Sequence, residues 1–268
     1  MAIQLFLLGA DDPEMQAVER LLAQNGIPFA YATVGGVRAT PGNSYRIDPV
    51  TVPNECELVV IECAFHGMPS STTTIDHHRE GDPGFALGPD RFWEASSIGQ
   101  LHALLGLAPG PDARVVAAFD HCFAAAACGM CEGVEPEEII HMRVSEMSKE
   151  TGRLGSDIWA SVNDFRCAFT AAPEVMIGNQ RVKDFRHQHL GKGYSFEYLA
   201  AQFAAAMGGF AVLLRHGDHV RSAEKYTLTG YAEKRTIIAF MESWGPEQGL
   251  VRIFGVPQRG YAGGFISR

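Results

Sequence analysis

Long apolar runs and cysteines are both scarce in this sequence, which has six cysteines among 268 residues. No run approaches the roughly 18–20 apolar residues that a membrane-spanning helix needs, so we expect no membrane partner. The apolar start at Met1–Leu8 has no basic residues before it and continues into Asp11, Asp12 and Pro13, so we do not expect a secretory signal peptide. Few cysteines in mostly apolar surroundings favour reduced thiols and a cytoplasmic protein.

Basic residues are outnumbered: 22 lysines and arginines stand against 31 aspartates and glutamates, for a formal net charge of −9. A protein that coats duplex DNA needs an excess of positive charge, so this class of partner is disfavoured. The imbalance is uneven, because residues 1–150 carry 21 acidic and 8 basic side chains, whereas residues 151–268 carry 10 acidic and 14 basic ones. This asymmetry indicates an acid-lined site in the first part that faces a more cationic partner surface.

Apolar, β-branched segments alternate with helical patterns in the first part of the chain. The expected strands are residues 3–8, 29–34, 58–63, 72–75 and 115–119, and the expected helices are residues 14–24 and 93–105. Strands that alternate with helices are joined by crossover connections, so we expect an α/β fold with a parallel sheet and helices on both faces. We assign this domain to residues 1–150.

The second part of the chain has a different pattern. Helical sequence dominates residues 136–172, and residues 173–194 look irregular, so we expect a helical linker region at 151–194. A smaller mixed α/β domain at 195–268 follows. Its expected helices are residues 196–207 and 233–243, and its expected strands are residues 210–215, 226–229 and 250–254.

Acidic residues and histidines follow the expected strands of the first domain. Glu14 follows the first strand, Glu62 ends the LVVIEC strand, His77 follows the next one, and Asp120 follows the VVAAF strand. Functional groups gather at the carboxyl ends of parallel strands, so we expect these four side chains to converge. A set rich in carboxylates with one imidazole suits Mn²⁺ or Mg²⁺ better than zinc, which prefers cysteine and histidine. The alternative to metal binding is that these residues are solvated strand ends and helix caps.

The segment Thr73-Thr74-Ile75-Asp76-His77-His78 resembles the hallmark of the DHH phosphoesterase superfamily. That group includes RecJ-type exonucleases, oligoribonucleases that digest very short RNA, exopolyphosphatases and manganese-dependent inorganic pyrophosphatases. The order of the acidic motifs is also similar, and Glu94–Leu101 looks like the small-residue helix start that these proteins place after the triad. The resemblance covers about residues 3–130.

The resemblance implies metal-dependent hydrolysis of a phosphoester or phosphoanhydride, in a small nucleotide, a short oligonucleotide or a related phosphate compound. In that case His78 contacts phosphate, Arg79 helps to neutralise developing charge, and Asp76 orients the histidines. His121 would contact the substrate.

The first motif departs from the pyrophosphatase pattern Gly-His-x-Asn-Pro-Asp-x-Asp. Ala10 occupies the histidine position, Glu14 and Gln16 occupy the two aspartate positions, and Glu62 replaces the aspartate of the second motif. Two ligands are therefore missing, and we expect one ion rather than two. The same departures favour an alternative, in which the chain has lost turnover and binds a nucleotide or phosphorylated ligand as a sensor. A third alternative is a different α/β enzyme in which the triad is coincidental.

A glycine-rich segment at residues 255–265 occupies the place of the late substrate-binding motif of this group, without its histidine. We expect Arg259 to meet phosphate with its planar guanidinium group, and Gly260, Gly263 and Gly264 to allow close approach of the ligand to the backbone. A bend between closing strands is the alternative interpretation. A homo-oligomer is compatible with the sequence.

Overall fold

The computed structural model describes residues 3–53, 55–193, 195–218 and 223–266. The chain forms two compact units, Met1–His121 and Cys122–Arg268. Within the described ranges, no helix combines the length and the apolar character that crossing a bilayer requires. The division lies well before the expected linker at 151–194, and most of that segment belongs to the structure of the second unit.

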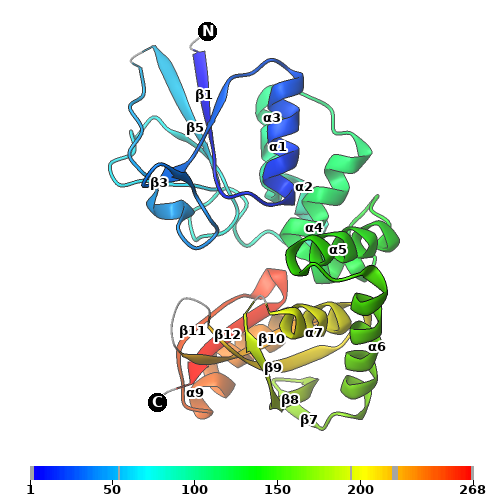
Figure 1. Ribbon diagram of the computed structural model, residues 1–268. Helices are drawn as coiled ribbons and strands as arrows, with labels where there is room; N and C mark the ends of the chain where they lie inside the picture. The colour runs from blue at the N-terminus through cyan, green and yellow to red at the C-terminus, as the bar shows by residue number, and fades with distance from the viewer. Residues whose placement is uncertain (1–2, 54, 194, 219–222, 267–268) are drawn as a thin grey trace. The chain divides into compact units, whose positions relative to one another are not determined.

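The first unit is built on a four-stranded parallel sheet in the order β2-β1-β5-β6, of which β1 and β5 are labelled in Figure 1. Its strands and turns of 3-10 helix are β1 Ile3–Leu8, β2 Phe29–Tyr31, β3 Thr33–Val34, β4 Val37–Arg38, η1 Ser44–Arg46, β5 Cys56–Ile61, β6 Thr73–Ile75 and η2 Pro89–Arg91. Its α-helices are α1 Pro13–Gln24, α2 Phe92–Ala95, α3 Ser97–Leu105 and the first part of α4 Pro111–Ala127.

The register of the parallel sheet brings three strand ends to one edge. Leu8 pairs with Ile61, and Ile61 pairs with Ile75, so β1, β5 and β6 end side by side. The expected strands in these three places are therefore confirmed. The residues that follow β5 and β6 are the predicted acidic and histidine motifs.

The two faces of this sheet are covered differently. Helices α1 and α3 pack against each other beside the sheet (Figure 1). The opposite face carries Leu7, Leu58 and Val60, which pack with Ala32 and other apolar side chains of the loops and the β3–β4 hairpin. The prediction of helices on both faces was therefore wrong, because apolar loop residues between 32 and 68 cover the second face.

The expected strand at residues 115–119 is wrong, because these residues lie inside helix α4. A short apolar run fits a buried strand and a buried helix equally well, and the β-branched Val115 and Val116 favoured the first. The helix has the signals of its own start, with Pro111 at its first residue and Asp112 in its first turn. Helical backbone is interrupted at Cys122, where φ is −150° and ψ is 51°.

The second unit holds a six-stranded mixed sheet in the order β11-β12-β10-β9-β8-β7. Only the β8–β9 pair is parallel among the described pairs of this sheet. The strands are β7 Glu174–Ile177, β8 Gln180–Lys192, β9 Ala211–Gly217, β10 Glu224–Gly230, β11 Leu250–Val256 and β12 Tyr261–Ile266. The helical segments are α5 Pro136–Thr151, α6 Gly155–Ala171, α7 Phe196–Met207, α8 Lys234–Ala239, the π-helix η3 Phe240–Trp244, α9 Gly245–Glu247 and the 3-10 turn η4 Pro257–Arg259.

Two segments of the second unit contain strands that the sequence did not predict. Residues 173–194 were expected to be irregular, but residues 174–177 and 180–192 form the antiparallel pair of β7 and β8, and residue 194 lies outside the described residues. The glycine-rich end forms β12, which lies between β10 and β11. Neither segment shows the alternation of apolar and polar residues that is typical of strands. Charged residues interrupt it in the first segment, and glycines interrupt it in the second.

The core of the second unit is divided between two apolar clusters, one on each side of the sheet. One contains the aromatic side chains Phe169, Phe185 and Phe203, and the other contains Phe240 and Trp244.

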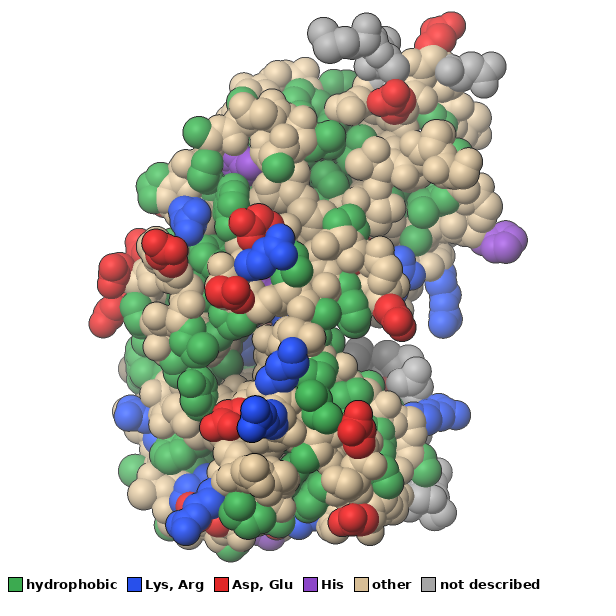
Figure 2. Space-filling model, turned by 180° about the vertical axis from the view of Figure 1, so that it is seen from behind, with side chains coloured by type: hydrophobic (Ala, Val, Ile, Leu, Met, Phe, Trp, Pro, Cys, Tyr) green, Lys and Arg blue, Asp and Glu red, His purple; other side chains and the backbone are tan. Residues whose placement is uncertain are grey.

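On the surface face shown in Figure 2, acidic and basic side chains lie interspersed. This is the arrangement of an ordinary solvated surface.

Candidate metal centre

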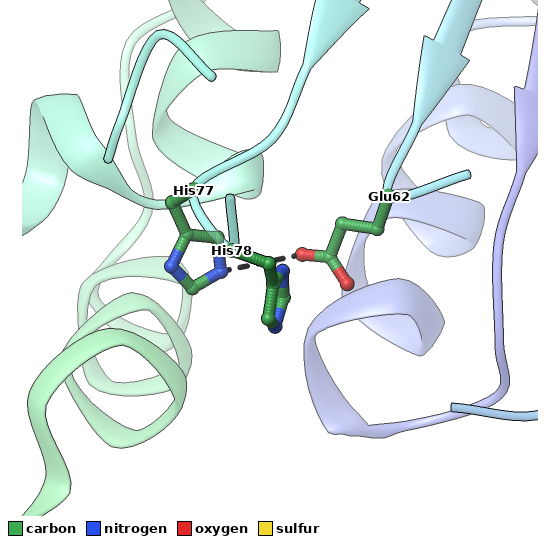
Figure 3. A group of neighbouring side chains, drawn as sticks. All are labelled: Glu62, His77 and His78. Atoms are coloured by element: carbon green, nitrogen blue, oxygen red, sulfur yellow. Dashed lines mark ion pairs between the residues drawn. The ribbon is translucent and has the colours of Figure 1, made fainter. Parts of the chain in front are cut away.

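Four side chains converge at the edge of the parallel sheet, and they are the four predicted metal ligands: Glu14, Glu62, His77 and Asp120. Each offers one ligand atom, and these atoms all lie within 4.8 Å of one another. His77 Nε2 lies 3.0 Å from Asp120 Oδ2, 3.4 Å from Glu62 Oε1 and 3.5 Å from Glu14 Oε2. Figure 3 shows Glu62 and His77 extending toward one another from neighbouring strand ends.

The start of helix α3 holds two of the carboxylates in place. The Ser97 hydroxyl donates a hydrogen bond to Glu62 Oε1 at 2.7 Å, and the Ile98 N–H donates to Glu14 Oε1 at 3.0 Å. Backbone N–H groups at a helix start are unpaired within the helix and favour negative charge. Gly99 permits this close packing, since a Cβ there would collide with the carbonyl oxygen of Trp93.

Glu62 adopts a left-handed backbone conformation with φ of 51°. Non-glycine residues rarely adopt this region, and the strain is of order 1–3 kcal/mol. Gly9 lies directly against this turn, since a Cβ on Gly9 would be 2.5 Å from the Glu62 carbonyl oxygen. The strained turn redirects the chain at the end of β5 and places the Glu62 carboxylate beside His77.

Two polar atoms of this cluster are fully buried and make no hydrogen bond to any residue that the structure describes. They are Glu14 Oε2 and His77 Nε2, and both side chains are 0% exposed. Buried polar atoms are almost always hydrogen-bonded, so such atoms require an explanation. Three carboxylates and one imidazole nitrogen facing one point match the ligand set of a divalent cation. The residues present therefore could hold a metal ion.

The charges of the cluster are unbalanced in the direction that a cation would correct. Burial, together with Asp120 and Glu62, raises the pKa of Glu14 well above its ordinary value. Burial lowers the pKa of His77, but its three carboxylate neighbours outweigh burial and raise this pKa well above its usual range. Burial, Glu62 and Asp120 raise the pKa of Asp12, which also caps helix α1 through Met15 N–H.

No protein-family model matches this chain, and no curated protein matches it.

Asp76 lies behind the cluster and accepts hydrogen bonds from several donors. The His77 N–H, the His78 N–H and His78 Nδ1 lie 2.7, 3.0 and 3.0 Å from Asp76 Oδ1, and the Tyr45 hydroxyl lies 2.9 Å from Oδ2. Burial raises the pKa of Asp76, but the bonds from His78 and Tyr45 outweigh it and lower this pKa overall. The ionised carboxylate therefore holds the backbone of both histidines and the side chain of His78.

His78 faces outward from this support. Its side chain is 39% exposed, and its imidazole forms a second group of possible ligands with Glu62 and His77, again within 4.8 Å (Figure 3). Because Nδ1 is bonded to Asp76, Nε2 is the atom available to a bound molecule. Arg79 lies nearby, with its guanidinium carbon 3.7 Å from the centre of the Tyr45 ring.

His121 is placed differently from the predicted substrate contact. Its side chain is buried, with Nδ1 3.0 Å from His77 Nδ1 and Nε2 3.0 Å from the Leu87 carbonyl oxygen. Both ring nitrogens thus face protein groups. His121 supports the ring of His77 from behind, on the side opposite the carboxylates.

The remaining predicted residues belong to the second unit. Arg259 has its guanidinium 6.0 Å from the Tyr261 ring, and Gly260 follows it with φ of 72°. A Cβ on Gly263 would meet the Phe254 ring, and a Cβ on Gly264 would meet Leu250. These two glycines allow close packing between strands, and their contact with a ligand stays a prediction.

Three supporting residues were missed by the sequence analysis: Tyr45, Ser97 and Leu87. Ser97 lies within the small-residue helix start at Glu94–Leu101. The sequence pattern there predicted a helix but not the hydrogen bond from Ser97 to Glu62. Tyr45 reaches the site from the short 3-10 turn η1, and Leu87 from an irregular segment. Their contacts depend on loop conformation, for which the sequence has no periodic pattern.

Proposed function

We propose that this chain is a metal-dependent hydrolase of phosphoesters or phosphoanhydrides, acting on a small nucleotide, a short oligonucleotide or a related phosphate compound. The observation that supports it is the pair of buried, unbonded atoms, Glu14 Oε2 and His77 Nε2, inside a group of three carboxylates. The proposed ion is Mn²⁺ or Mg²⁺, because oxygen-rich sets suit these ions. The divergent DHH motif Asp76-His77-His78 is part of the same proposal.

The roles of the residues follow from their positions. Glu14, Glu62, His77 and Asp120 would hold the ion, which when bound lowers the pKa of a water molecule and neutralises phosphoryl oxygens. His78 Nε2 is oriented by the bond from its Nδ1 to Asp76, so it can donate a proton or hydrogen bond to a phosphoryl oxygen.

A panel of substrates tests the proposal directly. Release of phosphate or nucleotide is measured from nucleoside phosphates, dinucleotides and pyrophosphate, with and without added Mn²⁺. We expect Mn²⁺-dependent turnover in the wild type and in His141→Ala, a control at an exposed histidine of helix α5, and none in His77→Ala. Turnover that is equal in His77→Ala and wild type would contradict the proposal.

Binding of a phosphorylated ligand without turnover is the second candidate function. It is favoured by the position of Gln16, which is exposed and bonds to Asp11 at 3.1 Å instead of joining the cluster. Ala10 likewise offers no ligand. The same panel distinguishes the two functions, because a sensor would bind a compound in calorimetry and release no product.

A further inference from the structure

We propose that His121 is a positioning residue that fixes the proton of His77 on Nδ1 and thereby presents the His77 Nε2 lone pair to the ion. This inference rests on the proposed metal site and adds a residue to it. Its basis is a chain of hydrogen bonds that runs from the Leu87 carbonyl through His121 to His77.

The first link of this chain determines the proton on His121. A carbonyl oxygen can only accept a hydrogen bond, so His121 Nε2, which lies 3.0 Å from the Leu87 oxygen, carries a proton. A neutral imidazole carries one N–H, which leaves His121 Nδ1 as an acceptor.

The second link determines the proton on His77. The two Nδ1 atoms lie 3.0 Å apart, and one proton lies between them. Since His121 Nδ1 accepts, His77 Nδ1 donates. The other nitrogen of His77, Nε2, is then the atom that can act as a ligand, and it is the one that faces Glu14, Glu62 and Asp120.

The position of His121 in the chain connects it to the cluster. Asp120 and His121 are consecutive residues of helix α4, and they contact opposite sides of the same ring: Asp120 lies 3.0 Å from His77 Nε2, and His121 lies 3.0 Å from Nδ1. One turn of helix therefore places a carboxylate and the supporting imidazole together.

The loop that carries Leu87 is packed closely against His77. A Cβ on Gly84 would lie 2.7 Å from the His77 Cβ and would collide with the Ala95 carbonyl oxygen, so glycine permits this approach. Gly84 N–H also donates to the Asp76 carbonyl oxygen at 2.9 Å. The carbonyl that fixes the His121 proton is thus held by the same segment that carries the histidine motif.

Nitrogen NMR of the metal-free wild type tests the hydrogen-bond chain without any ion. Ring spectra of selectively labelled histidines are expected to show His121 protonated on Nε2 alone and His77 protonated on Nδ1. A proton on His121 Nδ1 would overturn the inference, whatever the protein does with metal.

Calorimetry with Mn²⁺ alone tests the consequence for binding. His121→Leu removes the acceptor and is expected to weaken Mn²⁺ binding by about 10- to 100-fold, the usual cost of losing a ligand's hydrogen-bond partner. His121→Gln keeps an acceptor oxygen and a donor amide and is expected to restore most of the affinity. Equal affinity in wild type and His121→Leu would overturn the inference.

The failure of the proposed function has a separate signature. If wild-type protein binds neither Mn²⁺ nor Mg²⁺, the metal site is wrong, even where the spectra show the expected protons. If wild type binds and both His121 variants bind equally weakly, while their circular dichroism and thermal unfolding match wild type, the hydrogen-bond chain is wrong and the metal site stands.

Discussion

Each unit of this protein buries a histidine, and the two are treated in opposite ways. In the second unit, His216 is satisfied on both ring nitrogens, since Nδ1 lies 3.1 Å from the Gly217 carbonyl oxygen and Nε2 lies 2.7 Å from the Thr227 hydroxyl. Its ring also packs on Tyr198, with centres 4.0 Å apart. In the first unit, His77 has Nε2 surrounded by three carboxylates and hydrogen-bonded to none that the structure describes.

Electrostatics separates the two residues as clearly as hydrogen bonding does. Burial and the nearby Lys225 lower the pKa of His216 to about 4. The carboxylates around His77 raise its pKa despite equal burial. A buried histidine is therefore no functional signal in itself; an unsatisfied nitrogen among like-charged acids is the informative observation.

The largest expected difference between the two histidines is in metal binding. His77→Ala removes one of the four proposed ligands and is expected to weaken Mn²⁺ binding by more than about 100-fold. This exceeds the loss of about 10- to 100-fold that follows when a ligand only loses its hydrogen-bond partner. His216→Ala is the matched control and is expected to leave Mn²⁺ affinity unchanged. Calorimetry measures both, and thermal unfolding with Mn²⁺ at 100 times the wild-type dissociation constant should show about 2.7 kcal/mol of stabilisation in wild type and in His216→Ala, but much less in His77→Ala. Equal losses of Mn²⁺ affinity in His77→Ala and His216→Ala would contradict the expected difference between the two histidines.

Acid destabilisation is expected to reveal His216. Its pKa is about 4 in the folded protein and about 6.5 in the unfolded chain, so the unfolded state binds more protons between these values. The contribution of this group to stability is fully present above about pH 6.5 and falls by about 3 kcal/mol as pH decreases to about 4. Denaturant titrations across this range should be flatter for His216→Gln than for wild type. His141→Gln, at an exposed histidine, should follow wild type.

Tyr45→Phe tests the support of the histidine motif. The variant removes a hydrogen bond to the ionised Asp76 and is expected to lower the free energy of unfolding by about 1.5 kcal/mol. Mn²⁺ affinity should change by less than about threefold, because Tyr45 contacts none of the four ligands. The control is Tyr231→Phe, at a tyrosine that is 41% exposed. A Tyr45→Phe protein as stable as its control would show that the hydroxyl bond has no net effect.

Glu14→Gln is expected to have the smallest effect on stability and the opposite sign. An amide replaces a carboxylate whose charge is disfavoured by burial and by neighbouring acids, so the metal-free protein should gain about 1 kcal/mol. Mn²⁺ affinity should fall in the same variant. Glu57→Gln, at an exposed residue of β5, should change neither quantity. A loss of stability in Glu14→Gln would mean that the carboxylate is compensated within the protein.

The convergence of the four side chains could be predicted because, in a parallel sheet, the order of the strands decides which strand-end residues lie together. Glu62 and His77 follow adjacent strands as expected. Asp120 was predicted for a wrong local reason, since it lies on helix α4 and not at the end of a strand. Asp120 still joins the group because a helix that passes beside the sheet edge can bring a carboxylate there, as a strand end does.

The supporting contacts could not be predicted in the same way. The sequence predicted that His121 contacts the substrate; only the folded loop shows that the Leu87 carbonyl oxygen lies 3.0 Å from its Nε2. Strand β8 was missed because it pairs with β9 across an intervening helix, and its register shifts twice. Pairings between distant segments leave little trace in local sequence.

Glu62 has a consequence for anyone who would engineer this protein. A chain optimised for folding alone would place glycine or asparagine at a left-handed position, because either adopts it with less strain. Here a charged side chain occupies that position beside other acids, and it accepts a strain that glycine would avoid. A search for a sturdier scaffold would begin by replacing Glu62, and the resulting protein would no longer be a candidate catalyst.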